Sequence, residues 1–226
     1  MQKYPKTLLL LDLATVLLLA VATVLVFAYA PLERTMGAVQ KVFYFHVASN
    51  WVGMLGFLVA AVAGAVYLVK GTRFWDVLEV AAVEIGLVFS LIGIVTGSIW
   101  ARPIWNTWWT WDARLVTVTI MVLIYIAYFL LRQGIDDPGR RARYAAVYAI
   151  VGFLSVPLTF FSIRLFQSIH PVVITSTKAQ LSPRMKTVFM FSLFTYTVLF
   201  ADLLWHRTRL GQLAAHLETL RQKMLD

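Results

Sequence analysis

Long apolar segments alternate with short polar ones along the whole chain. A helix needs about 17 to 25 predominantly apolar residues to cross the hydrocarbon layer of a bilayer. Six segments reach that length, approximately over residues 7–30, 46–69, 77–99, 115–131, 144–165 and 187–205. The pattern predicts an all-α, polytopic membrane protein with six transmembrane helices in residues 1–205 and a tail in residues 206–226.

The first apolar segment has some features of a signal peptide. Lys3 and Lys6 precede it, and Ala28-Tyr29-Ala30 resembles a cleavage site. Its apolar run, however, exceeds the ~7–15 residues of a signal-peptide core, and Pro31 would directly follow the cut. We therefore interpret this segment as a retained transmembrane helix.

Composition agrees with a membrane protein. Hydrophobic residues make up 60% of the chain and charged residues 14%, and the mean hydropathy is +0.76, which no soluble domain of this size sustains. The absence of cysteine excludes disulfides, thiolate metal sites and thioether bonds to a cofactor. The net charge of +9 is better explained by cytoplasmic loops and anionic lipid than by nucleic acid.

The distribution of lysine and arginine predicts the orientation in the membrane. Twelve of these residues fall on the side of the two termini and eight on the other side. Because basic residues accumulate in cytoplasmic loops, we expect both termini to be cytoplasmic. The loops at about 31–45, 100–114 and 166–186 would then face outward, the second of them lying between the third and fourth helices.

The C-terminal tail carries apolar residues at helical spacing. This pattern predicts an amphipathic helix, which either lies on the membrane or packs against a partner. The tail sequence does not choose between the two. The apolar residues are Leu210, Leu213, Ala214, Leu217, Leu220 and Met224.

Tryptophan is concentrated in "WARPIWNTWWTWDARL", residues 100–115. A helix beginning at Pro103 would place Trp105, Trp108, Trp109 and Asp112 on one face, at positions i, i+3, i+4 and i+7. Such a face would be a flat apolar platform for a large planar ligand. The alternative is an aromatic belt at the membrane interface, where tryptophan is common.

Two of the four histidines lie on the same predicted side as this tryptophan stretch. His46 opens the second apolar segment, and His170 follows the fifth. A single interfacial histidine is more often structural, but two beside an aromatic platform favour iron ligation, since neutral imidazole is a common iron ligand. His206 and His216 belong to the tail, where a solvated or partner-facing role is the default.

At these residues the chain resembles a known family. "WNTWWTWDARL" is similar to the tryptophan-rich WWD motif of the haem-handling membrane proteins of cytochrome c maturation. Six spans and the two histidine contexts most resemble the haem exporter protein C (CcmC) family, since the longer CcmF and CcsA types have additional spans and more histidines. The resemblance covers the chain from about Lys3 to Trp205.

The resemblance implies a function and a set of site residues. CcmC-type proteins present haem b at the periplasmic face of the bacterial inner membrane and pass it to the haem chaperone CcmE. They work beside the ABC-type subunits CcmA and CcmB and the small protein CcmD. The implied axial ligands are His46 and His170. The implied haem platform is Trp105, Trp108, Trp109, Trp111 and Asp112, with Arg114 completing the motif.

This sequence departs from the family pattern at two places. Asn106 stands where a glycine is usual after the first tryptophan of the motif. Leu165 and Phe166 stand before the second histidine, where family members often carry tryptophans. The second departure keeps apolar bulk.

Several charged residues lie near the predicted site or within the predicted spans. The two haem propionates need cationic partners, for which the outer-side candidates are Arg102, Arg114, Arg164, Lys178 and Arg184, with Arg114 and Arg164 favoured. Alternatively, Arg114 snorkels or pairs with Asp112. Four acids lie toward the cytoplasmic ends of their spans. We expect Glu79 and Asp202 to snorkel, and Asp12 and Glu84 to contact a partner span.

Three other functional classes are weighed against haem delivery. An electron-transfer cytochrome of the b type would place paired histidines within the hydrocarbon, and no predicted span has an interior histidine. A permease that itself moves haem or another solute remains an alternative. An enzyme is disfavoured, because the chain has no nucleophile-and-base motif, metalloprotease signature or phosphate loop.

Overall fold

The protein is a bundle of α-helices. The computed structural model describes residues 4–166, 168–170 and 181–225, apart from the side chains of residues 222 and 225. Six helical stretches in this part of the chain are long and apolar enough to cross a membrane. The predicted all-α fold with six spans is therefore confirmed, as is the multi-pass membrane character of the chain.

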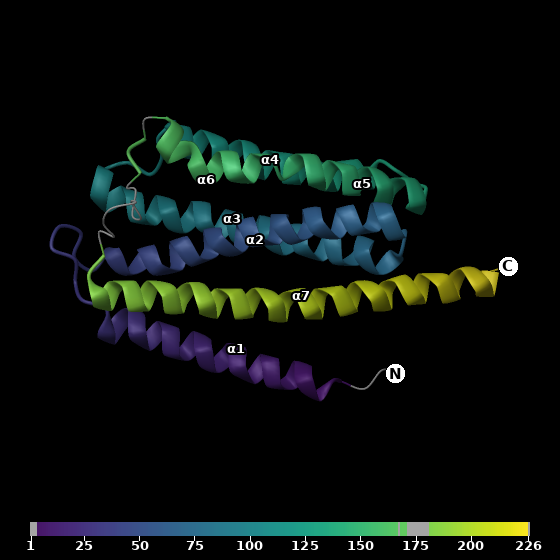
Figure 1. Ribbon diagram of the computed structural model, residues 1–226, viewed down its shortest axis with the longest axis horizontal. Coiled ribbons are helices and arrows are strands. Elements are labelled where there is room, and N and C mark those ends of the chain that lie inside the picture. The colour runs from purple at the N-terminus through teal and green to yellow at the C-terminus, as the bar shows by residue number, and fades with distance from the viewer. Residues whose placement is uncertain (1–3, 167, 171–180, 226) are drawn as a thin grey trace.

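The spans follow the predicted order and form layers (Figure 1). Helices α2 and α3 make up the central layer, α4, α5 and α6 cover one side of it, and α7 covers the other, with α1 outermost against α7. The elements are α1 (Lys6–Val24) with the π-helical turn η1 (Leu25–Tyr29), α2 (Gln40–Lys70), α3 (Arg73–Trp105), α4 (Ala113–Gln133), α5 (Pro138–Gly152), α6 (Ser155–Leu165) and α7 (Pro183–Leu225).

The fifth span is interrupted between α5 and α6. The break falls at Phe153 and Leu154. Pro157 follows four residues after Phe153, and a proline ring clashes with the carbonyl of the residue four positions earlier while it also removes one hydrogen bond. The proline therefore accounts for a local break, and α5 and α6 together still form one spanning stretch.

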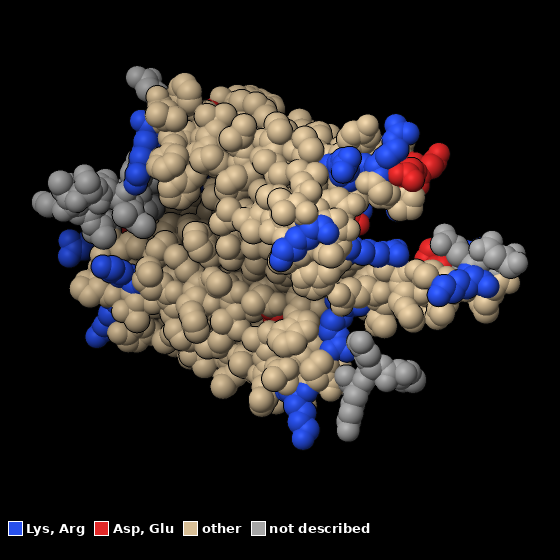
Figure 2. Space-filling model, turned by 45° about the vertical axis from the view of Figure 1, so that its right-hand side comes forward, with Lys and Arg blue, Asp and Glu red and all other residues tan. Residues whose placement is uncertain are grey.

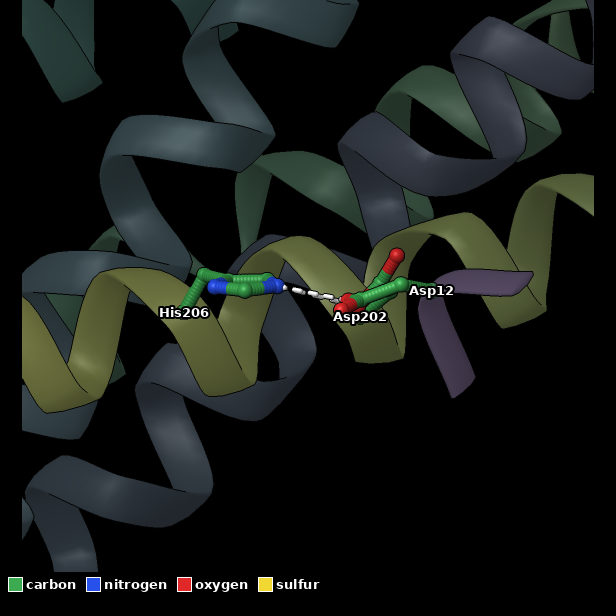
Figure 3. Close-up of side chains that lie close together, drawn as sticks. All are labelled: Asp12, Asp202 and His206. Atoms are coloured by element: carbon green, nitrogen blue, oxygen red, sulfur yellow. Dashed lines mark hydrogen bonds and ion pairs between the residues drawn. The ribbon is translucent and has the colours of Figure 1, made fainter. Parts of the chain in front are cut away.

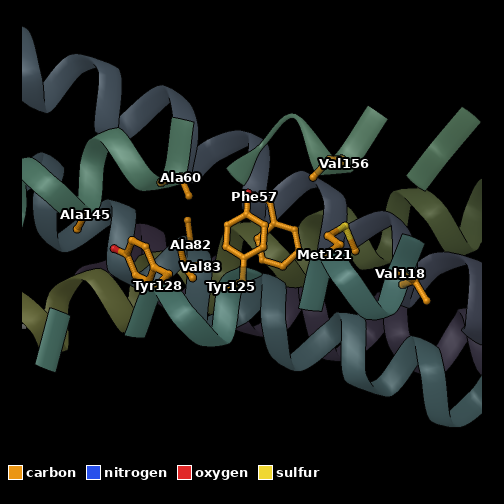
Figure 4. Close-up of a cluster of buried hydrophobic side chains, with 11 residues drawn as sticks. Phe57, Ala60, Ala82, Val83, Val118, Met121, Tyr125, Tyr128, Ala145 and Val156 are labelled. Carbon is orange, nitrogen blue, oxygen red and sulfur yellow. The ribbon is translucent and has the colours of Figure 1, made fainter. Parts of the chain in front are cut away.

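The centre of the bundle is packed around α2 and α3. A side chain at Gly56 would lie 2.8 Å from the backbone of Gly86, so the two helices approach at backbone distance. Small residues permit this approach, which is a common way for helices to associate within a membrane. Around this contact, Phe57 stacks on Tyr125 within a cluster of buried side chains from α2, α3, α4, α5 and α6 (Figure 4).

The four acidic residues that the sequence singled out within the spans lie against other helices. Glu79 is fully buried and accepts a hydrogen bond from Tyr128 at 2.9 Å, so the expectation that it snorkels is wrong. Asp202 is also buried, beside Asp12 of α1, so the expectation that it snorkels is wrong as well. Asp12 lies 2.8 Å from His206 of α7, and Glu84 pairs with Arg207 of α7 at 2.7 Å. Within this chain, Asp12 and Glu84 therefore join neighbouring helices.

Charged side chains lie at the two ends of the bundle, and the surface between them is apolar. Lysines and arginines gather at both ends, with a broad uncharged surface between them (Figure 2). The N- and C-terminal ends of the chain lie at the same end of the bundle (Figure 1). The loop that joins α3 to α4 lies at the opposite end.

Candidate functional site

A large cavity opens at the end of the bundle that carries the α3–α4 loop. Its volume is about 450 Å³, within the ~300–1,000 Å³ typical of small-molecule sites. The walls are mostly apolar and come from α2, α3, α4, α6, α7, the α3–α4 loop and His170, which follows α6. Seven predicted site residues line this cavity: His46, His170, Trp105, Trp108, Trp109, Arg114 and Arg164.

His46 is held by the neighbouring helix α3. Its Nδ1 lies 2.9 Å from the carbonyl oxygen of Gly93, which can only accept a hydrogen bond, so Nδ1 carries the proton. The other ring nitrogen, Nε2, then keeps its lone pair, and the amide nitrogen of Asn50 lies 3.5 Å from it. Gly97 makes room for the ring, because a side chain there would lie 2.8 Å from His46 Cε1. A histidine fixed in this way suits metal ligation through Nε2.

His170 is fixed in a similar manner by a carboxylate. Its Nδ1 donates to Asp112 Oδ2 at 3.2 Å, and both side chains are largely buried. Trp105 packs against the imidazole ring, with ring centroids 5.3 Å apart at 66°. Because Asp112 accepts the Nδ1 proton, the Nε2 of His170 also keeps its lone pair. Two histidines from distant parts of the chain thus line one cavity, and both are protonated at Nδ1.

The Asp112–His170 pair has a defined charge state. Burial alone raises the pKa of the Asp112 carboxyl, but the backbone N–H groups that it caps and the facing His170 outweigh burial and hold this pKa below its ordinary value. Burial and the nearby Arg114 guanidinium together hold the pKa of His170 below its ordinary value, although Asp112 raises it. The ionised carboxylate therefore faces a histidine that is neutral near pH 7, the form that ligates metals.

The tryptophan stretch is not one helix, so the predicted single helical face is wrong. Helix α3 ends at Trp105, because Asn106 adopts the left-handed conformation with φ of 54°. Asparagine tolerates this conformation better than most residues. The next helix begins at Ala113, where Asp112 caps the N–H groups of Arg114 and Leu115. Pro103 accordingly lies in the last turn of α3 and begins no helix.

The tryptophans consequently separate into different environments. Trp105 and Trp109 are partly buried in the cavity wall, and Trp108 lines the cavity while 59% of it is exposed. Trp111 is 76% exposed and does not line the cavity. Asp112 does not line it either, but acts on it through His170. The end of α3 and the loop after it therefore bring three of the four predicted platform tryptophans to the cavity, without the regular spacing of one helical face.

The arginine candidates for propionate binding also separate. Arg164 and Arg114 line the cavity, and Arg114 Nη1 donates to the carbonyl oxygens of Thr159 and Phe160 in α6. The Arg114 side chain therefore joins α4 to α6, and among the described residues it neither snorkels nor forms an ion pair with Asp112. Arg102 instead donates to Asn106, and Lys178 lies outside the described residues.

Arg184 lies away from the cavity. Its guanidinium packs over the ring of Tyr29 at 5.6 Å from the ring centroid, and it does not contribute to the cavity wall. Among the four arginines proposed from the sequence, Arg114 and Arg164 thus remain near the cavity, which are the two that the sequence favoured.

Other cavity residues were not singled out in the sequence. Asn50 lies one turn after His46, donates to the His46 carbonyl at 2.9 Å, and packs against Gly93. Trp100 also lines the cavity, and its indole N–H and that of Trp109 are buried with no acceptor among the described residues. The spacing of Gly93 and Gly97, one helical turn apart, is a signal in the sequence for the close approach of His46 and Asn50.

These features fit a haem group. The cavity is apolar and of suitable size, and both histidines keep an Nε2 lone pair for an axial position. The unpaired indole N–H groups of Trp100 and Trp109 belong to residues of the wall, where acceptor groups of a ligand can meet them. Arg114 and Arg164 supply positive charge.

Comparisons with known proteins point in the same direction. A family model described as Heme exporter protein C matches residues 2–223. A relative with that name from Bradyrhizobium diazoefficiens is 38% identical over 143 residues, which cover 63% of this chain and 54% of the relative. The Heme exporter protein C of Escherichia coli is 31% identical over 201 residues, covering 88% of this chain and 81% of the relative.

A eukaryotic relative is also similar. The "putative cytochrome c biosynthesis ccmC-like mitochondrial protein" of Marchantia polymorpha is 28% identical over 141 residues, which cover 62% of this chain and 59% of the relative. The chain thus spans little more than half the length of two of these three relatives.

Proposed function

The chain belongs to the haem exporter protein C family, a group of haem-handling membrane components, and on this premise we propose how it works. It binds haem b in the cavity at the periplasmic face of the bacterial inner membrane, and it delivers the haem to a CcmE-type chaperone during maturation of c-type cytochromes. One observation carries the proposal: His46 and His170, far apart in the sequence, line one apolar cavity with both Nδ1 atoms already bound.

The two histidines are the proposed axial ligands. Haem offers a planar apolar ring, an iron with two axial positions and two propionates. Gly93 and Asp112 hold the imidazole rings through Nδ1, so both Nε2 atoms are unprotonated, and the Nε2 of His46 lies 3.5 Å from the amide nitrogen of Asn50, which haem would displace. Hydrogen bonding of this kind orients a ligating histidine and raises its basicity. Because Asp112 is ionised, it increases the basicity of His170 more than the neutral carbonyl of Gly93 increases that of His46.

The remaining wall residues set the position of the ring. Trp105 at the end of α3, with Trp108 and Trp109 from the α3–α4 loop, gives apolar, polarisable contacts. Arg164 is the proposed propionate partner, supported by its place in the wall. Arg114 contributes positive charge while its Nη1 remains on the α6 carbonyls. Nothing in this set transfers a group, so we propose a haem-presenting subunit and not an enzyme.

Delivery requires that haem leaves again. A loop between two helices, with Trp108 and Trp111 largely exposed, gives a partner protein direct access to the cavity rim. We propose that the CcmE-type chaperone docks on this loop, and that CcmA- and CcmB-type ABC subunits with a small CcmD-type protein complete the assembly. The α3–α4 loop, which helps to line the cavity, lies at the end opposite the termini, which fits cytoplasmic termini and an outward haem site.

A haem titration of the purified protein in lipid nanodiscs tests the proposal. The wild-type chain should give a Soret band with bis-histidine character. His46→Ala and His170→Ala should each weaken haem binding and shift the band, whereas His216→Ala in the tail serves as the matched control and should change neither. An unshifted spectrum of full intensity in the His46→Ala/His170→Ala double variant would refute the ligand assignment.

Transport by this chain alone is the competing hypothesis. Proteoliposomes that contain only this protein distinguish the two. A presenting subunit should saturate with haem at its cavity and accumulate none in the lumen. Time-dependent accumulation of haem inside the vesicles would favour a permease.

A further inference from the structure

Helix α7 continues well beyond the rest of the bundle. It is one helix over Pro183–Leu225, 43 residues, and at 1.5 Å per residue it is about 65 Å long, roughly twice the ~30 Å hydrocarbon layer. Its C-terminal end projects past the other helices along the direction of the bundle (Figure 1). The last turns of α7 therefore contact no other helix of the described chain, and they lie at the end opposite the α3–α4 loop.

The projecting part carries a narrow apolar stripe, which we name the α7 seam. The spacings between its members alternate between three and four residues. This is the a/d pattern of a coiled-coil interface, narrower than the apolar face of a helix that lies in a membrane surface. The seam consists of Leu210, Leu213, Leu217, Leu220 and Met224, whose exposed fractions run from 43% to 80%.

The seam faces away from the bundle, and packing at its start fixes that direction. Gly211 lies against α3, because a side chain there would come within 2.6 Å of Val77. Thr208 is buried, and Arg207 pairs with Glu84 of α3 at 2.7 Å. These residues occupy the opposite side of α7 from the seam, at helical spacing. Rotation of the seam toward the bundle would break these contacts.

Nearer the membrane, the same face of α7 is covered by α1. His206 and Asp202 lie one and two turns before Leu210 on this face. His206 Nε2 is 2.8 Å from Asp12 Oδ1 of α1, and Asp202 is beside the same pair (Figure 3). Tyr4 lies 3.4 Å from His206 as well. Helix α1 begins at Lys6, so the helix that covers this face starts where the seam begins. The seam therefore continues the face of α7 that contacts α1, but no helix of the described chain packs against it.

The charges beside the seam select the partner. The flanking positions hold Arg209, His216 and Lys223 on one edge and Arg221 on the other, and no acidic residue flanks the seam in the described chain. Charges at these positions choose partner and orientation in coiled coils. A second copy would place basic residues opposite basic residues, whether the two helices ran parallel or antiparallel.

A lipid surface fits the geometry less well than a protein helix. To lie on the membrane, the tail would have to bend away from the bundle direction, and α7 has no break between Pro183 and Leu225. We therefore infer that the α7 seam is the docking site for an acidic amphipathic helix of another protein, which adds a helix in line with α1. Two heptads bind weakly alone, but tethering within one membrane assembly supplies a high effective concentration.

Cysteine labelling tests this inference cleanly, because the chain contains no cysteine. Leu217→Cys places a thiol on the seam, and Ala215→Cys places the matched control on the opposite face. Labelling by a water-soluble maleimide is compared in three preparations, each accessible from both sides. These are native membranes that hold the complete maturation system, nanodiscs of the purified chain in neutral lipid, and nanodiscs in anionic lipid.

The seam thiol should be protected only in native membranes. Since labelling follows the open fraction of a site, near-complete occupancy should slow the reaction of Leu217→Cys about tenfold there, while Ala215→Cys reacts equally in all three preparations. The triple reversal Arg209→Glu/Arg221→Glu/Lys223→Glu should restore fast labelling of Leu217→Cys in native membranes. Glu218→Arg, away from the seam, should leave the protection intact.

Each other outcome overturns the inference. Fast labelling in native membranes would mean that nothing covers the seam. Protection in anionic nanodiscs would assign the seam to lipid, and protection in neutral nanodiscs would assign it to a second copy. Protection that survives the triple reversal would exclude an acidic partner. The haem spectrum of the same variants should be unchanged, so this inference and the proposed haem function can fail separately.

Discussion

Asp112 joins His170 to the first turn of α4. Its Oδ2 accepts the Nδ1 proton of His170 at 3.2 Å, while its Oδ1 accepts the backbone N–H groups of Arg114 and Leu115 at 2.9 and 3.1 Å. One carboxylate therefore caps a helix and orients a cavity histidine. The acid that closes the tryptophan stretch acts behind the cavity wall and not on its surface.

Asp112→Asn should separate these two roles. Asparagine caps helices about as well as aspartate, so the fold should be retained, but the charge that supports His170 is lost. Loss of such a partner typically weakens metal binding about 10–100-fold, and we expect a similar loss of haem affinity, measured by titration in nanodiscs.

Asp112→Ala provides the comparison, since it removes the cap as well and should cost about 0.5–2 kcal/mol of stability. The assignment would be contradicted if Asp112→Asn bound haem as tightly as the wild type while Asp112→Ala did not, because capping alone would then explain the residue.

Gly97→Ala should displace His46 without altering the cavity lining chemically. The added carbon would lie 2.8 Å from His46 Cε1, closer than real contacts allow, so the ring must rotate away from its Gly93 partner. We expect a shifted Soret band and weaker haem binding, with helix content unchanged by circular dichroism. Gly134→Ala is the matched control, because its nearest contact would be an ordinary 3.6 Å. Equal haem spectra for the two variants would show that Gly97 does not position His46.

Most of the architecture could be predicted from the sequence, because a bilayer imposes one requirement on every span: about 20 apolar residues with internal hydrogen bonds. The interruption at Pro157 and the end of α3 could not be read from hydropathy. The latter depends on one backbone conformation, at Asn106. Two residues do indicate a break between helices: Asn106, of a type that tolerates the left-handed conformation, and Asp112, of a type that often caps a new helix. The helical spacing of the tryptophans favoured the opposite interpretation.

The cavity shows a different limit. That His46 and His170 belong to one end of the molecule followed from counting spans. Which groups hold their Nδ1 atoms depends on the register between α2 and α3 and on the path of the loop, neither of which has a local sequence pattern. The contact of His46 with Gly93 illustrates this, since the two residues are 47 positions apart.

The loop between η1 and α2 should respond to acid through Glu33. Its Oε2 accepts the backbone N–H groups of Thr35 and Met36 at 2.7 and 2.6 Å. The Met36 N–H is the largest cause that lowers the pKa of Glu33 below its ordinary value of about 4.5. Because the pKa is lowered in the folded state, the stabilisation is fully present above the ordinary value and is lost as the pH falls through the lowered one. The NMR shifts of the Thr35 and Met36 amides should titrate together in that range, and Glu33→Gln should abolish the titration. Amide shifts that titrate at or above 4.5 would contradict the assigned contacts.

Arg164 and Arg184 should differ in their effect on haem binding, although the sequence offered both as propionate partners. Arg164 lines the cavity, whereas Arg184 packs over Tyr29 outside it. An arginine–carboxylate contact is a charge-assisted hydrogen bond, worth about 1.5–3 kcal/mol, so Arg164→Gln should weaken haem binding by about 10–150-fold. Arg184→Gln should have little effect. Haem dimethyl ester, which lacks the propionate charges, provides the decisive control: the wild type and Arg164→Gln should bind it equally. If Arg164→Gln weakened the ester and haem alike, the residue would act on the cavity wall and not on a propionate.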